Sequence, residues 1–283
     1  DKRIKKIIKN FESNQIEKSE NLNKENNFAP KKIFGLTFPF KLINFIKVKC
    51  KDCEIAISYA KGGLSNVWGS YVTPFHKNDI KNWPITVEDL HDNYPEVEEF
   101  VNISSEKDNI DELYSYSLGR KHNYQLGQFF DKLYLRLIED KKELNQKGIY
   151  FGRSKAAIGN KYSIDGKDCM SLGLCHFGCP NRNIFCSAFL LDKMKKDKNF
   201  KYIDGIFADK ISEGTKSVSV RCIDIQSGKN TVHHCNKLFI ACGTINTTFL
   251  IKKSLNIKRN KIKIKDSQRF IFPIISLNLR GKY

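Results

Sequence analysis

The sequence predicts an α/β fold, and three observations support this class. Between residues 84 and 194 apolar residues recur at helical spacing in three segments, whereas after Lys198 short apolar runs separated by turn residues predict β-strands. The third observation is the run Lys237 to Leu250 (KLFIACGTINTTFL), in which a strand pattern meets a glycine and continues as a helical pattern. Strands that turn at glycine into helices are characteristic of α/β domains.

Three helices are expected in the first two thirds of the chain. The first spans Pro84 to Val101, with Thr86 as its N-cap and Pro95 expected to kink or split it. One face of this helix is expected to carry Leu90, Tyr94, Val97 and Val101. The second amphipathic helix is predicted for Tyr124 to Leu144 and the third for Ile184 to Met194.

Strands are expected in the last third. They are predicted for Tyr202 to Ile211, Val218 to Asp224 and Thr231 to Ala241, with turns at Glu213-Gly214 and at Ser227-Gly228-Lys229. A helix from Asn246 to Lys253 follows, and Phe270 to Leu279 is one more strand.

The composition fits a globular protein with a strong basic bias. The chain has 283 residues, enough for one large or two small domains, and 40% hydrophobic residues, enough for a sizeable core. Its formal net charge is +18, which would ordinarily suggest nucleic acid or an anionic membrane as partner. However, the positive residues are mostly lysines spread along the chain among Asn and Ile, and arginine, which bidentate phosphate contacts favour, is sparse. We therefore expect no nucleic-acid role, and a basic non-catalytic binding module stays as one alternative.

The chain carries neither a secretory signal pattern nor a transmembrane pattern. The most apolar early run, Phe34 to Val48, is interrupted by Lys41 and Lys47 and is shorter than the ~20 apolar residues that a membrane helix requires. A cytoplasmic protein is expected. Nine cysteines in such a chain indicate free thiols or metal ligation rather than a disulfide framework.

Residues 60 to 69 are the most informative stretch. Two adjacent glycines are followed by a hydroxyl, an amide and a large aromatic residue, a set that suits a loop laid against a flat, phosphate-bearing cofactor. The alternative is a glycine turn that leads into a strand with a core tryptophan. On the cofactor interpretation the candidate contacts are Gly62, Gly63, Leu64, Ser65, Asn66 and Trp68.

The segment GGLSNVWG resembles the flavin-contacting loop of the glucose–methanol–choline (GMC) oxidoreductases, in its pyranose-oxidase-like form. Three further segments resemble the same family in the same order: NWPITVEDL from Asn82, CMSLGLCHFGCP from Cys169, and the strand–glycine–helix run from Lys237. The resemblance implies part of a Rossmann-like FAD-binding domain and part of a mixed-sheet substrate domain.

It also implies a reaction: oxidation of a CH–OH group, of a sugar or related alcohol, by hydride transfer to flavin and then to an unknown electron acceptor. Valine at position 67 occupies the slot in which the pyranose-oxidase-like form has a flavin-linked histidine, so FAD is expected to be held non-covalently. The resemblance adds Ala208 as the position whose backbone meets the adenine, and Cys242-Gly243 as a place where the nucleotide approaches the backbone.

Two features of the family are missing. No G-x-G occurs in the chain, and none of the six histidines lies in a context like that of the family's catalytic base. We therefore assign no catalytic residue, expect the chain to be an internal fragment of a longer enzyme, and expect it not to bind FAD tightly.

The cysteine-bearing segment allows a different chemistry. Cys169, Cys175 and Cys179 precede Pro180 in a frame like that of bacterial ferredoxins, with Leu172 at the place of the second cysteine. Three thiolates in this frame suit a 3Fe-4S cluster, and the second alternative function is an iron–sulfur electron-transfer protein. The other interpretation is that these are ordinary buried thiols.

These expectations divide the chain into five segments. Residues 1–31 form a polar N-terminal segment, 32–110 the flavin-contacting part of the FAD domain, and 111–198 a helical and cysteine-bearing segment. Residues 199–255 return to the FAD domain as strands, and 256–283 begin the substrate domain.

Overall fold

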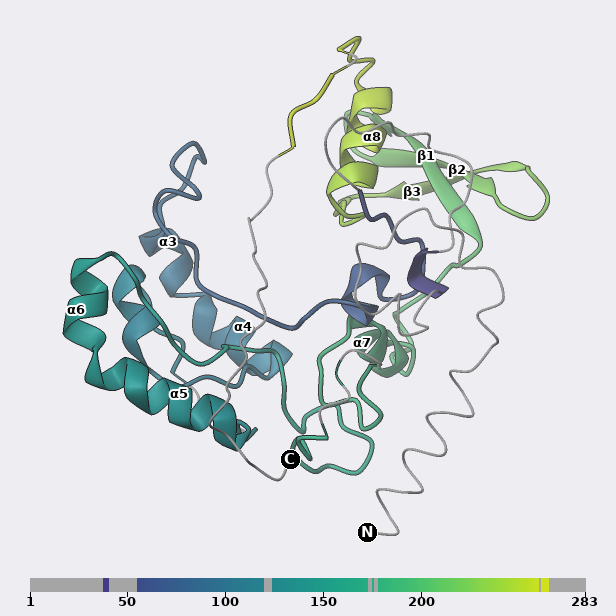
Figure 1. Cartoon of the computed structure of the whole chain (residues 1–283). Coiled ribbons are helices and arrows are strands. Elements are labelled where there is room, and N and C mark those ends of the chain that lie inside the picture. Colours follow the sequence, from purple (N-terminus) through teal and green to yellow (C-terminus); the bar gives the residue numbers. More distant parts are fainter. Residues whose placement is uncertain are drawn as a thin grey trace, which may run out of the picture.

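The computed structural model describes residues 38–40, 55–119, 124–172, 175, 178–259 and 261–264. Figure 1 shows a group of helices, α3 to α6, well separated from a small sheet that is covered by helix α8. Helix α7 lies between them, beside a short 3-10 helix, η2 (Gly63–Asn66), which it contacts. The predicted segment 1–31 and the predicted strand Phe270 to Leu279 lie outside the described residues.

The first predicted helix is split in two, as Pro95 indicated. Helix α3 spans Glu88–His91 and α4 spans Tyr94–Val101, with the proline in the first turn of α4, where its missing N–H breaks no hydrogen bond. The predicted N-cap is wrong by one residue, because α3 has Val87 at this position; Thr86 precedes it, and its hydroxyl accepts a hydrogen bond from the Asp89 N–H at 3.3 Å.

The expected apolar face of α4 is wrong at one position. Val97 is 48% exposed, whereas Glu98 beside it is only 4% exposed. The Glu98 carboxylate accepts hydrogen bonds from the Tyr116 hydroxyl at 2.7 Å and from the Gly119 N–H at 3.4 Å. Because these partners replace water, the carboxylate can be buried where the periodicity placed it outside.

The second predicted helix also differs from the structure. Helix α5 spans Gln128–Glu139 and α6 spans Lys141–Gln146, so the helix starts four residues later than predicted and is interrupted at Asp140. Helix α7 spans Ser187–Met194, three residues shorter at its start than predicted.

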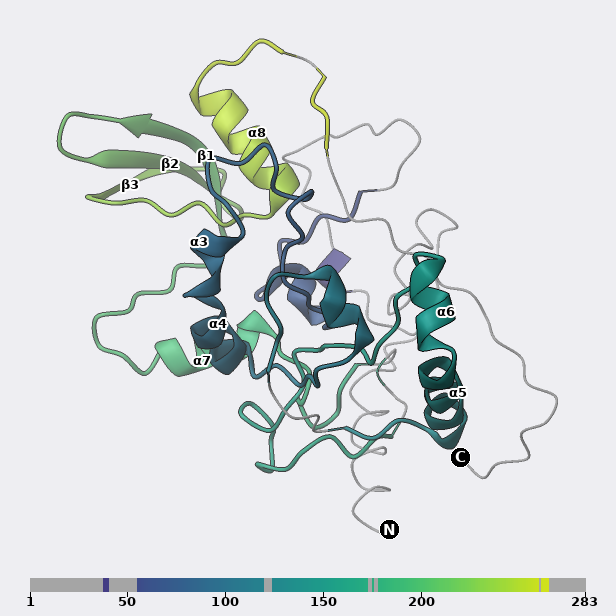
Figure 2. The ribbon, with the colours of Figure 1, turned by 90° about the vertical axis from the view of Figure 1, so that its left-hand side faces the viewer.

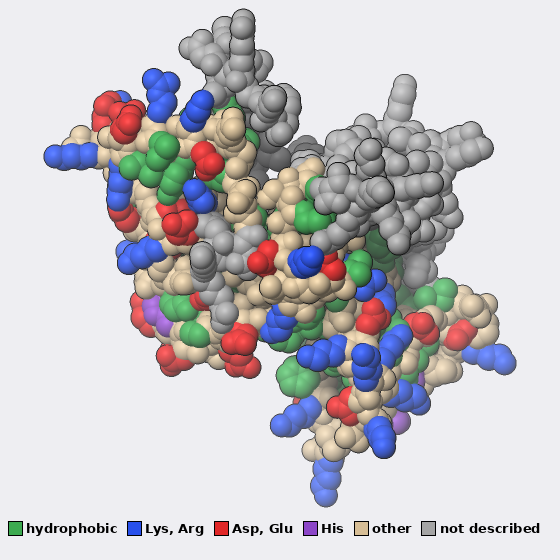
Figure 3. Space-filling view, turned by 90° about the horizontal axis from the view of Figure 1, so that it is seen from below, with side chains coloured by type: hydrophobic (Ala, Val, Ile, Leu, Met, Phe, Trp, Pro, Cys, Tyr) green, Lys and Arg blue, Asp and Glu red, His purple; other side chains and the backbone are tan. Residues whose placement is uncertain are grey.

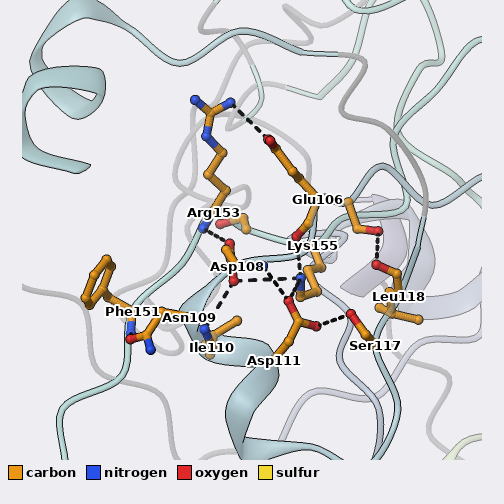
Figure 4. A network of polar contacts seen from close by, with 12 residues as sticks. Glu106, Asp108, Asn109, Ile110, Asp111, Ser117, Leu118, Phe151, Arg153 and Lys155 are labelled. Carbon is orange, nitrogen blue, oxygen red and sulfur yellow. Dashed lines mark hydrogen bonds and ion pairs between the residues drawn. The ribbon is translucent and has the colours of Figure 1, made fainter. Parts of the chain in front are cut away.

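A network of buried charges holds the loop before α5 to residues 151–155 (Figure 4). The Lys155 side chain is 1% exposed, and its Nζ lies 2.8 Å from Asp111 Oδ2 and 3.9 Å from Asp108 Oδ1. Lys155 Nζ also donates to the Glu106 carbonyl at 2.8 Å. Asp108 accepts from the Arg153 N–H at 2.7 Å, so each buried charge has a partner of opposite sign or a backbone donor.

The pKa values of the two carboxyl groups in this network, Asp108 and Asp111, are shifted in opposite directions. Burial raises the pKa of Asp108, against the opposing effect of the Arg153 N–H and Lys155. Burial also acts to raise the pKa of Asp111, but the hydrogen bonds from Lys155, the Asp108 N–H and Ser117 more than offset it and hold the value below the usual range.

The sheet is a three-stranded antiparallel meander in the order β1-β2-β3. Its strands are β1 (Ile206–Glu213), β2 (Val218–Asp224) and β3 (Asn230–Cys235), with the predicted turns between them. The prediction of a strand from Thr231 to Ala241 is wrong in its second half. The chain bends after Cys235, and residues 238–241 pair with no strand in the described part of the chain. The Rossmann-like parallel sheet stays a prediction.

Helix α8 (Thr244–Ser254) packs on β1, and a buried carboxylate joins the two. The ladder between β1 and β2 shifts between Ala208 and Lys210, and the extra residue, Asp209, is 7% exposed. Its carboxylate pairs with Arg221 on β2 and with Lys253 on α8. Burial acts to raise the pKa of Asp209, but these two cations more than offset it and hold the value below its usual range.

The basic composition does not form one continuous surface on the face shown in Figure 3, where acidic and uncharged side chains lie among the lysines and arginines. Among the described residues, no helix combines the length and the apolar character needed to cross a membrane.

Candidate functional site

A cavity of about 700 Å³ lies where four separate segments meet. Its wall is formed by residues 56–64, by the start and second turn of α7, by Tyr202 with the start of β1, and by residues 241–250, which turn into α8. Figure 2 shows the sheet and α8 above α7 in this region. Cofactor sites are commonly concave and within roughly 300–1,000 Å³, so this cavity has the size of a cofactor site.

Six of the nine predicted cofactor contacts line this cavity. They come from three segments far apart in the chain: Gly62, Gly63, Leu64, Ala208, Cys242 and Gly243. Nothing in the local sequence brings these segments together. Tyr59, just before the glycine loop, contacts the other two: its ring lies 6.3 Å from the Phe207 ring of β1, and its hydroxyl donates to Asn246 of α8.

Ser65 and Asn66 do not line the cavity, because their side chains hold the loop itself together. The Ser65 hydroxyl donates to the Gly62 carbonyl. The Asn66 amide donates to the carbonyls of Lys61 at 2.9 Å and Gly63 at 2.7 Å. These bonds fix the turn that places the two glycines on the cavity wall.

Trp68 also lies away from the cavity and packs against Phe185. Its indole N–H donates to the Phe185 carbonyl at 2.8 Å, and the two rings meet edge to face with their centroids 6.3 Å apart. Trp68 is half-buried and lies outside any strand, so it is neither a cavity contact nor the core tryptophan in a strand of the alternative interpretation.

The two glycines have backbone conformations that side chains disfavour. Gly62 has φ 83° and Gly63 has φ 53°. A Cβ on Gly62 would lie 2.8 Å from the Ala188 Cβ of α7, whereas a Cβ on Gly63 would meet nothing within 4 Å. Gly62 therefore allows the loop to pack on α7, and Gly63 presents bare backbone at the cavity.

The first turn of α8 supplies hydrogen-bond donors to the same cavity. Gly243 precedes this helix with φ 80° and ψ 159°, a conformation nearly restricted to glycine, and no side chain caps the helix start. The first N–H groups of an α-helix lack intrahelical partners and carry the positive end of its dipole. Because residues 243–246 line the cavity, this helix start favours an anionic or polar ligand edge there.

Sequence reasoning missed Ser187, which lines the cavity from the first turn of α7. Its hydroxyl lies 2.9 Å from the Ser65 hydroxyl oxygen and 3.1 Å from the Gly62 carbonyl oxygen. No local motif marks a serine at the start of a helix as a partner of a glycine loop more than a hundred residues earlier, so no signal in the sequence could have found it.

The described lining of the cavity contains no histidine and no carboxylate. Burial raises the pKa of two groups in this lining, Tyr59 and Cys242, and the Tyr59 hydroxyl donates to Asn246 Oδ1 at 3.4 Å. The wall can thus bind and orient a ligand, but its described lining offers neither a histidine nor a carboxylate as a general base.

The described residues of the cysteine segment form no metal site. The Cys169 sulfur accepts from the Ser171 N–H at 3.4 Å and the Cys179 sulfur accepts from the Asn183 N–H at 3.2 Å, while Cys175 is exposed. Among the described residues, which include all three predicted ligands, no group of three or more His, Cys, Asp or Glu side chains is placed to hold a metal ion. The structure gives the predicted iron–sulfur cluster no support.

Comparison with known proteins identifies the family. A family model described as GMC oxidoreductase matches residues 51–281, which is most of the chain and includes every segment of the cavity wall. A search of curated proteins found no match. The GMC oxidoreductases are FAD-binding enzymes, which agrees with the expected cofactor. The chain belongs to the GMC oxidoreductase family.

Proposed function

We propose that the cavity binds FAD without a covalent bond and that the protein takes part in oxidising a CH–OH group of a sugar or related alcohol. The observation that carries this proposal is the convergence of Gly62 to Leu64, Ala208 and Cys242-Gly243 on one cavity wall. These positions lie in three separate parts of the chain that resemble flavin-contacting segments of the family, and the fold brings all three to one cavity.

The residues present fit the cofactor. FAD is a long molecule with two flat ring systems and two phosphates, and it requires bare backbone and donors along its length. Gly63 and Gly243 present backbone to the cavity with open space where a Cβ would stand. The uncapped start of α8 offers donors for a phosphate or ring oxygen, and Leu64 and Phe249 supply apolar wall.

The cofactor, when bound, supplies the ring system that accepts a hydride from the alcohol carbon. The residues of this chain that line the cavity would hold and orient that ring system. The sugar preference rests on the pyranose-oxidase-like form of the GGLSNVWG loop. The electron acceptor and the base that removes the hydroxyl proton are left unassigned.

Titration of FAD into the purified chain tests the proposal. We expect saturable quenching of flavin fluorescence with weak affinity, since the chain carries no G-x-G for the pyrophosphate. Because Val67 cannot bond to flavin, all bound flavin should pass an ultrafiltration membrane after denaturation. An absence of saturable binding up to the solubility limit of FAD would contradict the proposed site.

The substrate class has its own test. With FAD bound under anaerobic conditions, an oxidisable sugar should bleach the visible absorbance of the flavin, whereas the matching deoxy sugar that lacks the reacting hydroxyl should leave it unchanged. If simple aliphatic alcohols bleach it and sugars do not, the sugar assignment is wrong while the flavin assignment stands.

A further inference from the structure

The start of α7 holds the glycine loop through a set of short contacts between segments more than a hundred residues apart. The Ser187 N–H donates to the Ser65 hydroxyl oxygen at 3.0 Å, and the Ser187 hydroxyl lies within hydrogen-bond distance of both that oxygen and the Gly62 carbonyl. Beside it, the buried Cys186 thiol donates to Asn66 Oδ1 at 3.3 Å. The turn Gly62–Asn66 is thus fastened at three points to one helix start.

The protons of this cluster can be assigned by counting donors. A serine hydroxyl has one proton to donate and two lone pairs that accept. The proton of Ser65 goes to the Gly62 carbonyl, so Ser65 accepts from Ser187. The Ser187 hydroxyl then donates its proton to the loop, to either the Gly62 carbonyl or Ser65. The lone pairs of the Ser187 hydroxyl oxygen can therefore accept a hydrogen bond from a ligand.

That acceptor stands on the cavity wall. Ser187 is exposed and lines the cavity next to Gly62 and Leu64, whereas Ala208, where the adenine is expected, belongs to β1. An acceptor cannot stabilise a phosphate oxygen, but it can accept from a ribityl hydroxyl or from the N–H of the flavin ring system.

We infer that Ser187 is a cofactor-positioning residue, which holds the Gly62–Asn66 turn and accepts a hydrogen bond from an O–H or N–H group in the flavin half of FAD. This inference rests on the proposed function. It assigns to the site a side chain that neither the loop motif nor the strand–glycine–helix motif contains.

The test compares Ser187→Ala with Ser187→Thr, which keeps the hydroxyl, and with Ser217→Ala, an exposed serine in the turn between β1 and β2. Loss of one hydrogen bond typically weakens binding about tenfold, so FAD should bind about tenfold more weakly to Ser187→Ala. The threonine variant should recover most of the affinity, and Ser217→Ala should bind like the wild type. ADP, titrated as a competitor, should bind Ser187→Ala as it binds the wild type.

Hydrogen–deuterium exchange without any flavin gives a second readout. The amides of residues 62–67 should exchange several-fold faster in Ser187→Ala than in the wild type, because the turn loses a fastening point. Equal FAD affinity for wild type and Ser187→Ala, or an equal loss of ADP affinity, overturns the inference. Failure of the wild type to bind FAD instead counts against the proposed function, so the two failures are distinguishable.

Discussion

Substitution of Gly62 by alanine tests whether the glycine loop is packed on α7 as the structure shows. Two costs add at this position. The left-handed conformation costs an L-residue about 1–2 kcal/mol, and a Cβ only 2.8 Å from the Ala188 Cβ and 3.0 Å from the Ala188 nitrogen forces the loop or the helix to move. Overpacking of this kind costs about 1–3 kcal/mol, so the total is about 2–5 kcal/mol of unfolding free energy.

Gly63→Ala is the matched control, because it shares the positive φ but has open space. Its Cβ would meet nothing within 4 Å, so only the conformational cost of about 1–2 kcal/mol applies. Urea unfolding of both variants, followed by circular dichroism, should show a lower midpoint for Gly62→Ala by an amount equivalent to about 1–3 kcal/mol at unchanged slope. Equal midpoints for the two variants would show that the loop does not approach α7 closely.

Three further predictions concern other parts of the molecule. Lys155→Met leaves buried carboxylates without their cation and should lower the free energy of unfolding by about 3–5 kcal/mol. Lys147→Met, which removes an exposed ion pair, should lower it by less than about 1 kcal/mol. Urea unfolding measures both changes. The pKa of Asp209 is depressed in the folded state, so its stabilisation is present above its unfolded pKa and is lost as the pH falls through the folded pKa. Asp209→Asn should therefore lose less stability than the wild type between neutral and acid pH, and parallel pH profiles of thermal unfolding would count against this pair. Gly243→Ala should weaken FAD binding. Gly228→Ala is its control, because Gly228 also has a positive φ and open space but lies in the β2–β3 turn, and it should leave FAD binding unchanged. If the two variants bind FAD equally well, Gly243 is not part of the site.

Patterns within a short stretch of sequence correctly predicted elements whose bounds depend on that stretch alone. The bounds of β2, Val218–Asp224, are those expected from its alternation and flanking turns, and Pro95 correctly indicated a split between α3 and α4. The burial of Glu98 could not be predicted in this way, because it depends on the hydroxyl of Tyr116 from a following loop. The periodicity of a helix reports which residues are apolar, and it carries no information about a polar partner from outside the helix.

The residues of the candidate site likewise fall into those that a local motif predicts and those that only tertiary packing places. The glycines of the cavity wall were predicted because their type is dictated by backbone conformation, which a short motif records. Ser65, Asn66 and Trp68 belong to the same motif, yet their side chains serve the loop and its packing. Ser187 could not be predicted, because its role arises only when α7 packs against η2.

The buried charges around Lys155 have a consequence for how this protein can change over evolutionary time. Removal of one member leaves an uncompensated charge, whereas simultaneous replacement of an ion pair by apolar residues of similar volume is often tolerated. Lys155 faces both Asp108 and Asp111, so removal of the charge at any one of the three positions should destabilise the fold. Among homologous sequences the three positions should vary as a unit, and lineages with an apolar residue at 155 should have lost the carboxylate at 111 as well.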